Sequence, residues 1–164
     1  MSRSLKFYLG LAMAVTLSIP FAALAGQKHQ GYARTLEDLR MARALLQRPG
    51  DQVQNGSQDE VSLAIGNIDG AIDEITKDAN IKNGSSRDVP AIDAHMQWSV
   101  RLATSMRMLD KAMLDCSKEK DNSGSEGLQA KVLGRLNRAH DRIRVAIDTV
   151  NFDYSARNLP TRND

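Results

Sequence analysis

Residues 61–79 read VSLAIGNIDGAIDEITKDA, and this stretch decides the fold class of the chain. Large apolar residues recur in it at steps of four and three, which is the period of one helix face. They are Val61, Ile65, Ile68, Ile72, Ile75 and Ala79. Ser57 and Glu60 have the spacing of a capping box just before the run. The pattern therefore predicts an amphipathic helix that starts near Ser57.

Three further segments have helical periodicity. The first, residues 32–47, stops before Pro49-Gly50, and the third, from about Pro90 to Lys118, has Asp88 as its expected N-cap. The fourth follows a second capping box, Ser123 with Glu126. The first is expected to bury Leu36, Leu39, Ala42, Leu45 and Leu46; the third Ile92, Met96, Ala103, Met106, Leu109, Met113 and Cys116; the fourth Leu128, Val132, Leu136, Ala139, Ile143, Ala146 and Val150.

The two halves of the chain resemble each other at an offset near 68 residues. Ile65-Gly66-Asn67-Ile68 aligns with Leu133-Gly134-Arg135-Leu136, and the capping boxes are paired as well. This favours a duplicated helical hairpin over two unrelated amphipathic patterns. Two hairpins that face each other close an all-α, up-and-down four-helix bundle over residues 26–150, with connections of about 8, 11 and 6 residues. Residues 26–31 and 151–164 lack the period and are expected to form loose ends.

The first 25 residues have the pattern of a cleaved signal peptide. Arg3 and Lys6 precede an uncharged apolar run, Phe7 to Ile19, and Ala23-Leu24-Ala25 is a small-x-small cleavage site. The run is shorter than the roughly 20 residues that a spanning helix needs, although an uncleaved N-terminal anchor is the alternative. We expect a periplasmic or secreted protein that starts at Gly26 and has no membrane span after cleavage.

Cleavage also removes the excess positive charge of the chain. The 22 Lys and Arg residues fall to 20 without Arg3 and Lys6, which equals the 20 Asp and Glu residues. A net charge of zero gives no indication of nucleic-acid binding or of an anionic membrane surface. Cys116 is the only cysteine, so it is either a small apolar residue of a helix interface or a thiol that pairs between two chains in a homodimer.

No pattern in the sequence indicates a resident cofactor, a metal site or catalysis. Glu-x-x-His pairs for a di-iron site and the Cys-x-x-Cys-His motif of covalent haem are both missing from the sequence. A noncovalent haem needs only one Met and one His that face each other across the core, and His140 and Met106 are the first candidates for this or another small-ligand site. The simpler interpretation makes Met a gap-filling core residue and His140 a boundary residue.

Two features are typical of binding surfaces. Trp98 and Leu102 widen the apolar face of the third helix, either because neighbouring helices bury them or because they form a docking surface for a partner. Gly66 and Gly70 each cost about 1 kcal/mol of helix stability relative to Ala, a cost that close packing of another backbone would explain.

The segments Leu39–Leu46 and Ala64–Ile75, with their echoes in the second half, carry a resemblance to small exported bacterial proteins of unknown function. Such proteins consist of a signal peptide and two helical hairpins, and the resemblance implies no activity or site. We therefore expect a noncatalytic interaction module of the cell envelope or extracellular space. The alternative is a carrier of a small ligand, haem or metal in the bundle core.

Overall fold

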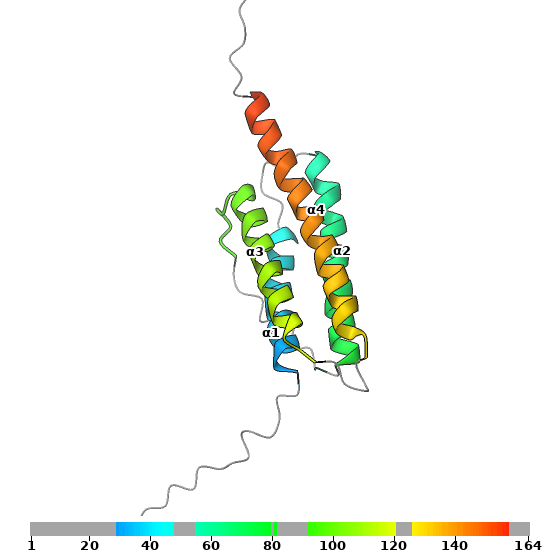
Figure 1. Cartoon of the computed structure of the whole chain (residues 1–164). Helices are drawn as coiled ribbons and strands as arrows, with labels where there is room; N and C mark the ends of the chain where they lie inside the picture. The colour runs from blue at the N-terminus through cyan, green and yellow to red at the C-terminus, as the bar shows by residue number, and fades with distance from the viewer. Residues whose placement is uncertain (1–28, 48–54, 80, 82–91, 121–125, 158–164) are drawn as a thin grey trace, which may run out of the picture.

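The computed structural model describes residues 29–47, 55–79, 81, 92–120 and 126–157, which form four α-helices and no strand (Figure 1). The helices are α1 (Gln30–Gln47), α2 (Asn55–Asp78), α3 (Trp98–Ser117) and α4 (Leu128–Arg157). The predicted all-α four-helix bundle is thus confirmed. The predicted signal peptide, Pro49-Gly50, Asp88, Pro90 and Ser123 lie outside the described residues.

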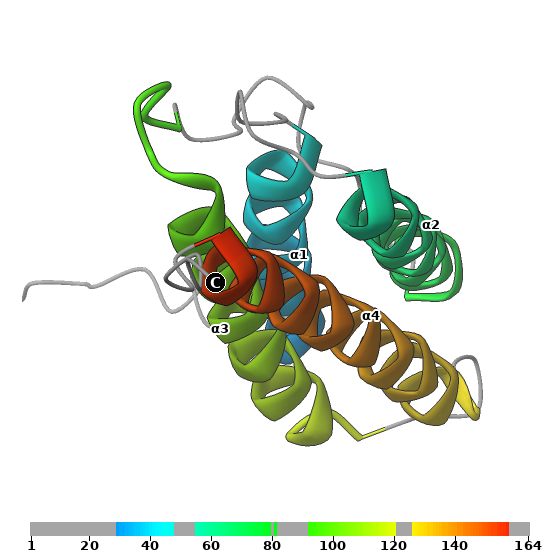
Figure 2. The same ribbon diagram turned by 90° about the horizontal axis from the view of Figure 1, so that it is seen from above.

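Each helix packs against two others, and the most extensive contacts join α2 to α4 and α1 to α3 (Figure 2). Both of these pairs are antiparallel. The contacts that show it are Gly31 with Glu119 and Asp38 with Lys111 between α1 and α3, and Glu60 with Arg142 and Glu74 with Arg135 between α2 and α4. The first and third helices are therefore antiparallel neighbours, and so are the second and fourth.

Figure 1 shows that α1 and α2 are antiparallel as well, so α2 and α3 run in the same direction, whereas the sequence predicts strict alternation. The connection between them spans 19 residues, from the end of α2 at Asp78 to the start of α3 at Trp98. Bundles with one long crossover connection have this order of directions. The prediction differed because it began the third helix near Pro90, which left too few residues to return along the bundle.

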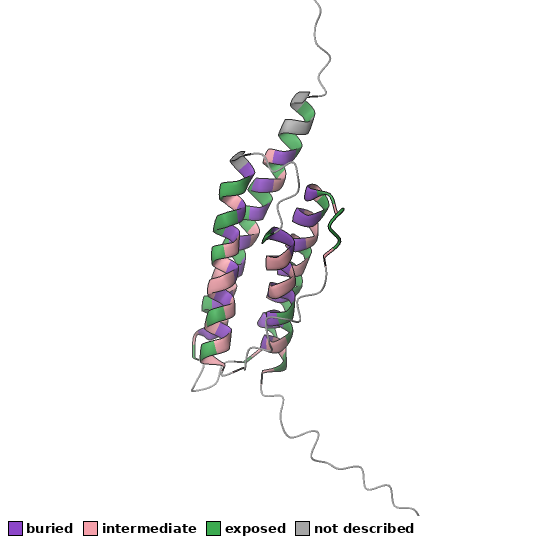
Figure 3. Cartoon of the chain, turned by 180° about the vertical axis from the view of Figure 1, so that it is seen from behind, coloured by how far each residue is buried: buried purple, intermediate pink, exposed green. Residues whose placement is uncertain are grey.

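Burial follows the predicted stripes of α1 and α4 completely, and the buried positions line the inner faces of the helices (Figure 3). In α2, Val61, Ile68 and Ile75 are buried as predicted, but Ala64 and Ala71 are buried where Ile65 and Ile72 were expected, and these two isoleucines are only partly buried. Small residues at a helix contact allow a closer approach of the two axes. The alanines therefore fit the extensive contact of α2 with α4.

The third helix begins eight residues later than predicted, because the preceding chain makes a local turn instead. The N–H of His95 donates to Asp93 Oδ1 over 2.9 Å, and the N–H of Met96 donates to the Asp93 carbonyl over 3.2 Å. Such aspartate turns compete with helical hydrogen bonding. Ile92 and Met96 consequently lie outside α3, whose buried face runs instead from Trp98 to Cys116.

The ends of the bundle are more helical than the sequence predicts. Helix α1 already starts at Gln30, and α4 continues to Arg157 through a segment expected to be loose, projecting beyond the neighbouring helices (Figure 1). An established helix extends by one hydrogen bond for each residue added, so it needs no apolar stripe there. Helix α2 also starts earlier, at Asn55, which places Ser57 inside the helix rather than at its cap.

The two glycines of α2 occupy different environments, and neither is packed against another backbone. A Cβ added at Gly66 would meet nothing within 4 Å, whereas one at Gly70 would lie 2.6 Å from Arg135 Nη1. Arg135 Nε in turn donates to Glu74 Oε1 over 2.8 Å. Glycine at position 70 therefore leaves room for a guanidinium that joins α4 to α2.

We predict that Gly66→Ala raises the free energy of unfolding by about 1 kcal/mol, because alanine is the better helix former. Gly70→Ala should gain less, because its methyl group displaces Arg135 from Glu74. Urea unfolding followed by circular dichroism measures both. In an Arg135→Ala background the two gains should become equal, and a persistent difference would contradict this role of Arg135.

Candidate functional site

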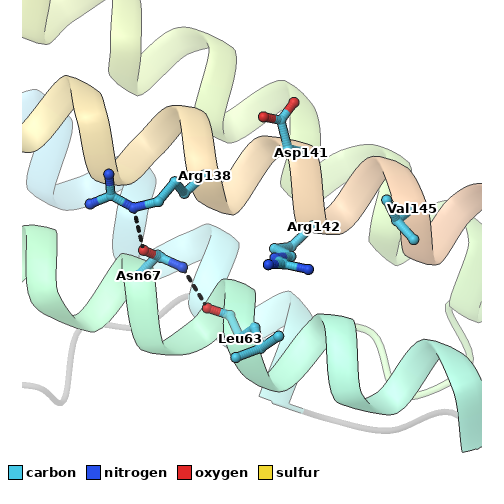
Figure 4. A pocket seen from close by; sticks show the side chains of 6 residues that line it. All are labelled: Leu63, Asn67, Arg138, Asp141, Arg142 and Val145. Atoms are coloured by element: carbon cyan, nitrogen blue, oxygen red, sulfur yellow. Dashed lines mark hydrogen bonds between the residues drawn. The ribbon is translucent and has the colours of Figure 1, made fainter.

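A groove of about 240 Å³ lies on the outer face of the bundle where α2 and α4 meet (Figure 4). We call it the α2–α4 groove; its walls are Leu63, Asn67, Arg138, Asp141, Arg142 and Val145. In Figure 4 the side chains of Arg138 and Arg142 extend toward α2, whereas Asp141 points away from it. The groove therefore presents more positive than negative charge to a ligand.

Three arginines of α4 face α2 at successive helical turns and form what we call the arginine ladder: Arg135, Arg138 and Arg142. Arg142 Nη1 lies 3.0 and 3.3 Å from the two carboxylate oxygens of Glu60, and Arg135 pairs with Glu74. The middle rung differs, because Arg138 Nε donates to the neutral side chain of Asn67 over 3.2 Å. Within the described residues Arg138 makes no ion pair, so its charge is not neutralised.

Asn67 holds this middle rung in place. Its Nδ2 donates to the carbonyl of Leu63 over 2.8 Å, which turns Oδ1 toward Arg138 (Figure 4). The amide thus orients the guanidinium without supplying a counter-charge. Beside it, the side chains of Leu63 and Val145 remain 50% and 43% exposed. The groove combines an oriented cation with two exposed aliphatic groups, and the sequence analysis missed it because its residues come from two separate helices.

The partner-binding candidates Trp98 and Leu102 are core residues. They are 7% and 0% exposed, and the guanidinium of Arg101 lies 5.7 Å from the centre of the Trp98 ring. Of the two interpretations of this broad apolar face, the structure supports burial by neighbouring helices. An exposed aromatic anchor at Trp98 is therefore not available to a partner.

The cofactor candidates His140 and Met106 lie at the boundary of α3 and α4. His140 Nε2 is 3.4 Å from Asp110 Oδ1, with the imidazole 26% exposed. Met106 is partly buried and packs against the core. Within the described residues no group of three or more His, Cys, Asp or Glu side chains is arranged to hold a metal ion. The contact with Asp110 engages Nε2, one of the two imidazole nitrogens that can bind a metal.

Cys116 is fully buried in the interface of α3 with its neighbours. The side chain of Gln129 on α4 donates to the Cys116 carbonyl over 3.1 Å, which fixes the end of α3. This burial agrees with the interpretation of Cys116 as a small apolar core residue.

The thiol of Cys116 should accordingly react slowly with a water-soluble disulfide reagent in the folded protein and rapidly in denaturant. Labelling at increasing urea concentrations, compared with circular dichroism, should show both transitions at the same midpoint. Rapid labelling without urea would contradict the burial.

A group of polar contacts joins α1 to the end of α3. The carboxylate of Glu119 accepts the N–H of Gly31 and lies 3.4 Å from His29 Nδ1, which places negative charge at the positive end of α1. Lys111 Nζ donates to Asp38 over 2.7 Å, and this bond raises the pKa of Lys111. The hydrogen bond from Lys118, at 2.9 Å, lowers the pKa of Asp115.

The lowered pKa of Asp115 implies a stability contribution that is present above the unfolded value, about 3.9, and lost as the pH falls through the folded one. Asp115→Asn should thus lower the free energy of unfolding near pH 7 by about 0.5–1 kcal/mol. It should also make this free energy fall less steeply at acid pH. Urea unfolding between pH 2.5 and 7 checks this. Lys118→Met should have the same effect and Lys111→Met a smaller one, because the hydrogen bond from Lys118 is the main cause of the lowered pKa of Asp115 and the charge of Lys111 is a lesser cause.

Comparisons with protein families, with curated proteins and with solved structures find no match for this chain. Among the described residues, no helix combines the length and apolar character needed to cross a membrane.

Proposed function

We propose that this chain is an exported, noncatalytic helical bundle that acts as a protein-interaction module in the periplasm or outside the cell. The observation that carries the proposal is the α2–α4 groove, where Arg138 lies beside the exposed aliphatic side chains of Leu63 and Val145. Exposed apolar groups beside an oriented arginine are typical of interaction surfaces. The signal pattern in residues 1–25 supports export.

The packing of the helices supports a scaffold role over the carrier alternative. The core is built from a continuous cluster of buried side chains contributed by all four helices. The two side chains considered for a cofactor, His140 and Met106, are both only partly buried. The surface groove is thus better supported as a binding site than the bundle core.

The duplicated-hairpin origin is part of the same proposal. Buried positions of α2 recur in α4 at an offset of 68: Ala64, Ile68, Ala71 and Ile75 correspond to Val132, Leu136, Ala139 and Ile143. Equivalent helices also pack against each other, as expected if two copies of a hairpin once associated through the same face. Such an association would leave the outer seam of α2 and α4 free for a new use.

The proposal predicts a partner at the groove in the native compartment. A photo-crosslinking amino acid at Leu63, in the chain expressed with residues 1–25 in its source organism, should give an adduct of discrete mass. The same group at Leu114, which is 58% exposed on α3, is the matched control. Equal adducts from both positions, or none from Leu63, would contradict a specific interaction surface.

Intact mass spectrometry of the same preparations tests the remaining parts. Cleavage after Ala25 should remove residues 1–25 from the exported protein. A bound mass that survives native conditions and disappears in His140→Ala would favour the carrier alternative instead.

A further inference from the structure

Arg138, the middle arginine of the ladder, indicates which kind of ligand the groove binds. A carboxylate at position 67 would complete the series formed by Glu60 and Glu74, yet the chain has Asn67 there. The amide keeps Arg138 oriented and leaves its positive charge unpaired within the described residues. Guanidinium groups form their strongest contacts with carboxylates, through paired, charge-assisted hydrogen bonds.

We infer that the α2–α4 groove binds an acidic helical segment of a partner protein, whose carboxylate pairs with Arg138 and whose aliphatic side chain packs between Leu63 and Val145. This inference rests on the proposed interaction function and names the partner chemistry. The partner supplies both a carboxylate and an aliphatic side chain, because either group alone would contact only part of the groove.

The spacing along α4 sets the spacing in the partner. Arg138 and Val145 are seven residues apart on α4, or about 10 Å at a rise of 1.5 Å per residue. A helix laid in the groove therefore presents its acidic and aliphatic residues about two turns apart, on one face. Binding of an amphipathic helix in a groove between two helices uses such anchors at helical spacing.

The charges of the protein favour a peptide over an anionic membrane. Recognition of anionic lipid takes a cluster of about four to eight basic residues, whereas two of the three ladder arginines are paired with Glu60 and Glu74. The chain without residues 1–25 has no excess positive charge. One unpaired cation beside two aliphatic groups matches a single carboxylate and a single apolar side chain.

Two synthetic helical peptides provide the probe: one carries Glu and Leu seven residues apart, and the other has Gln in place of the Glu. In an NMR titration of the exported chain, the Glu peptide should shift the Arg138 Nε–H and Asn67 amide signals and bind about tenfold more tightly than the Gln peptide. Arg138→Glu should remove this preference. Arg107→Glu, a charge reversal at an exposed arginine of α3, should leave it intact.

Asn67→Glu separates binding from folding, because it supplies the missing carboxylate within the protein. It should weaken the Glu peptide about as much as Arg138→Glu does, with no loss of unfolding free energy. Leu63→Ser should weaken both peptides equally, and Leu114→Ser should weaken neither. Equal affinity for the Glu and Gln peptides, or shifts on α3 rather than at the groove, would overturn the inference.

Other occupants give distinct results. Tighter binding to vesicles of anionic phospholipid than to the Glu peptide, lost in Arg138→Glu, would indicate that the groove binds a membrane surface and would overturn the inference. A dimer that is seen in sedimentation and that Arg138→Glu dissociates would indicate that a second copy of the chain occupies the groove, which would also overturn the inference. A Leu63 cross-link that persists in Arg138→Glu would overturn the acidic partner but leave the interaction function standing.

Discussion

The antiparallel contact between α2 and α4 is the constraint on which the rest of the structure depends. Helix α4 buries an apolar stripe from Leu128 to Val150, α2 buries Ala64, Ile68 and Ala71, and the contact between these two helices is the most extensive in the bundle. Small buried side chains such as those of the alanines allow a close approach of neighbouring helices. The pair of α1 and α3 is antiparallel too, and because α1 and α2 also run in opposite directions, α2 and α3 run in the same direction and need a long connection between them.

The outer edge of the same contact creates the α2–α4 groove. Close approach of the helices brings the arginine ladder of α4 within reach of α2, so that Arg142 and Arg135 pair with Glu60 and Glu74. Surface pairs of this kind contribute little stability individually. The two pairs flank Arg138, whose guanidinium is held by Asn67 and which lines the groove together with Leu63 and Val145.

The α1–α3 side of the bundle uses its polar residues differently. There the cations and carboxylates are matched, with Lys111 on Asp38 and Lys118 on Asp115. Glu119 completes this side by neutralising the start of α1. The two sides of the bundle thus differ in chemistry: ion pairs hold Asp38 and Asp115 on the α1–α3 side, whereas in the described part of the chain Arg138 on the α2–α4 side has no ion pair.

The sequence by itself determined the number of helices and the buried faces of α1 and α4, because a 3.6-residue apolar period needs no knowledge of neighbours. It misplaced the start of α3, where the turn at Asp93 competes with the helix, and it missed the helical residues 151–157 beyond the apolar stripe. Only the tertiary structure decided that Trp98 is buried, that α2 and α3 run in parallel, and that Asn67, Arg138 and Val145 share a groove. These depend on which helices become neighbours, and local periodicity specifies which face is buried but not what covers it.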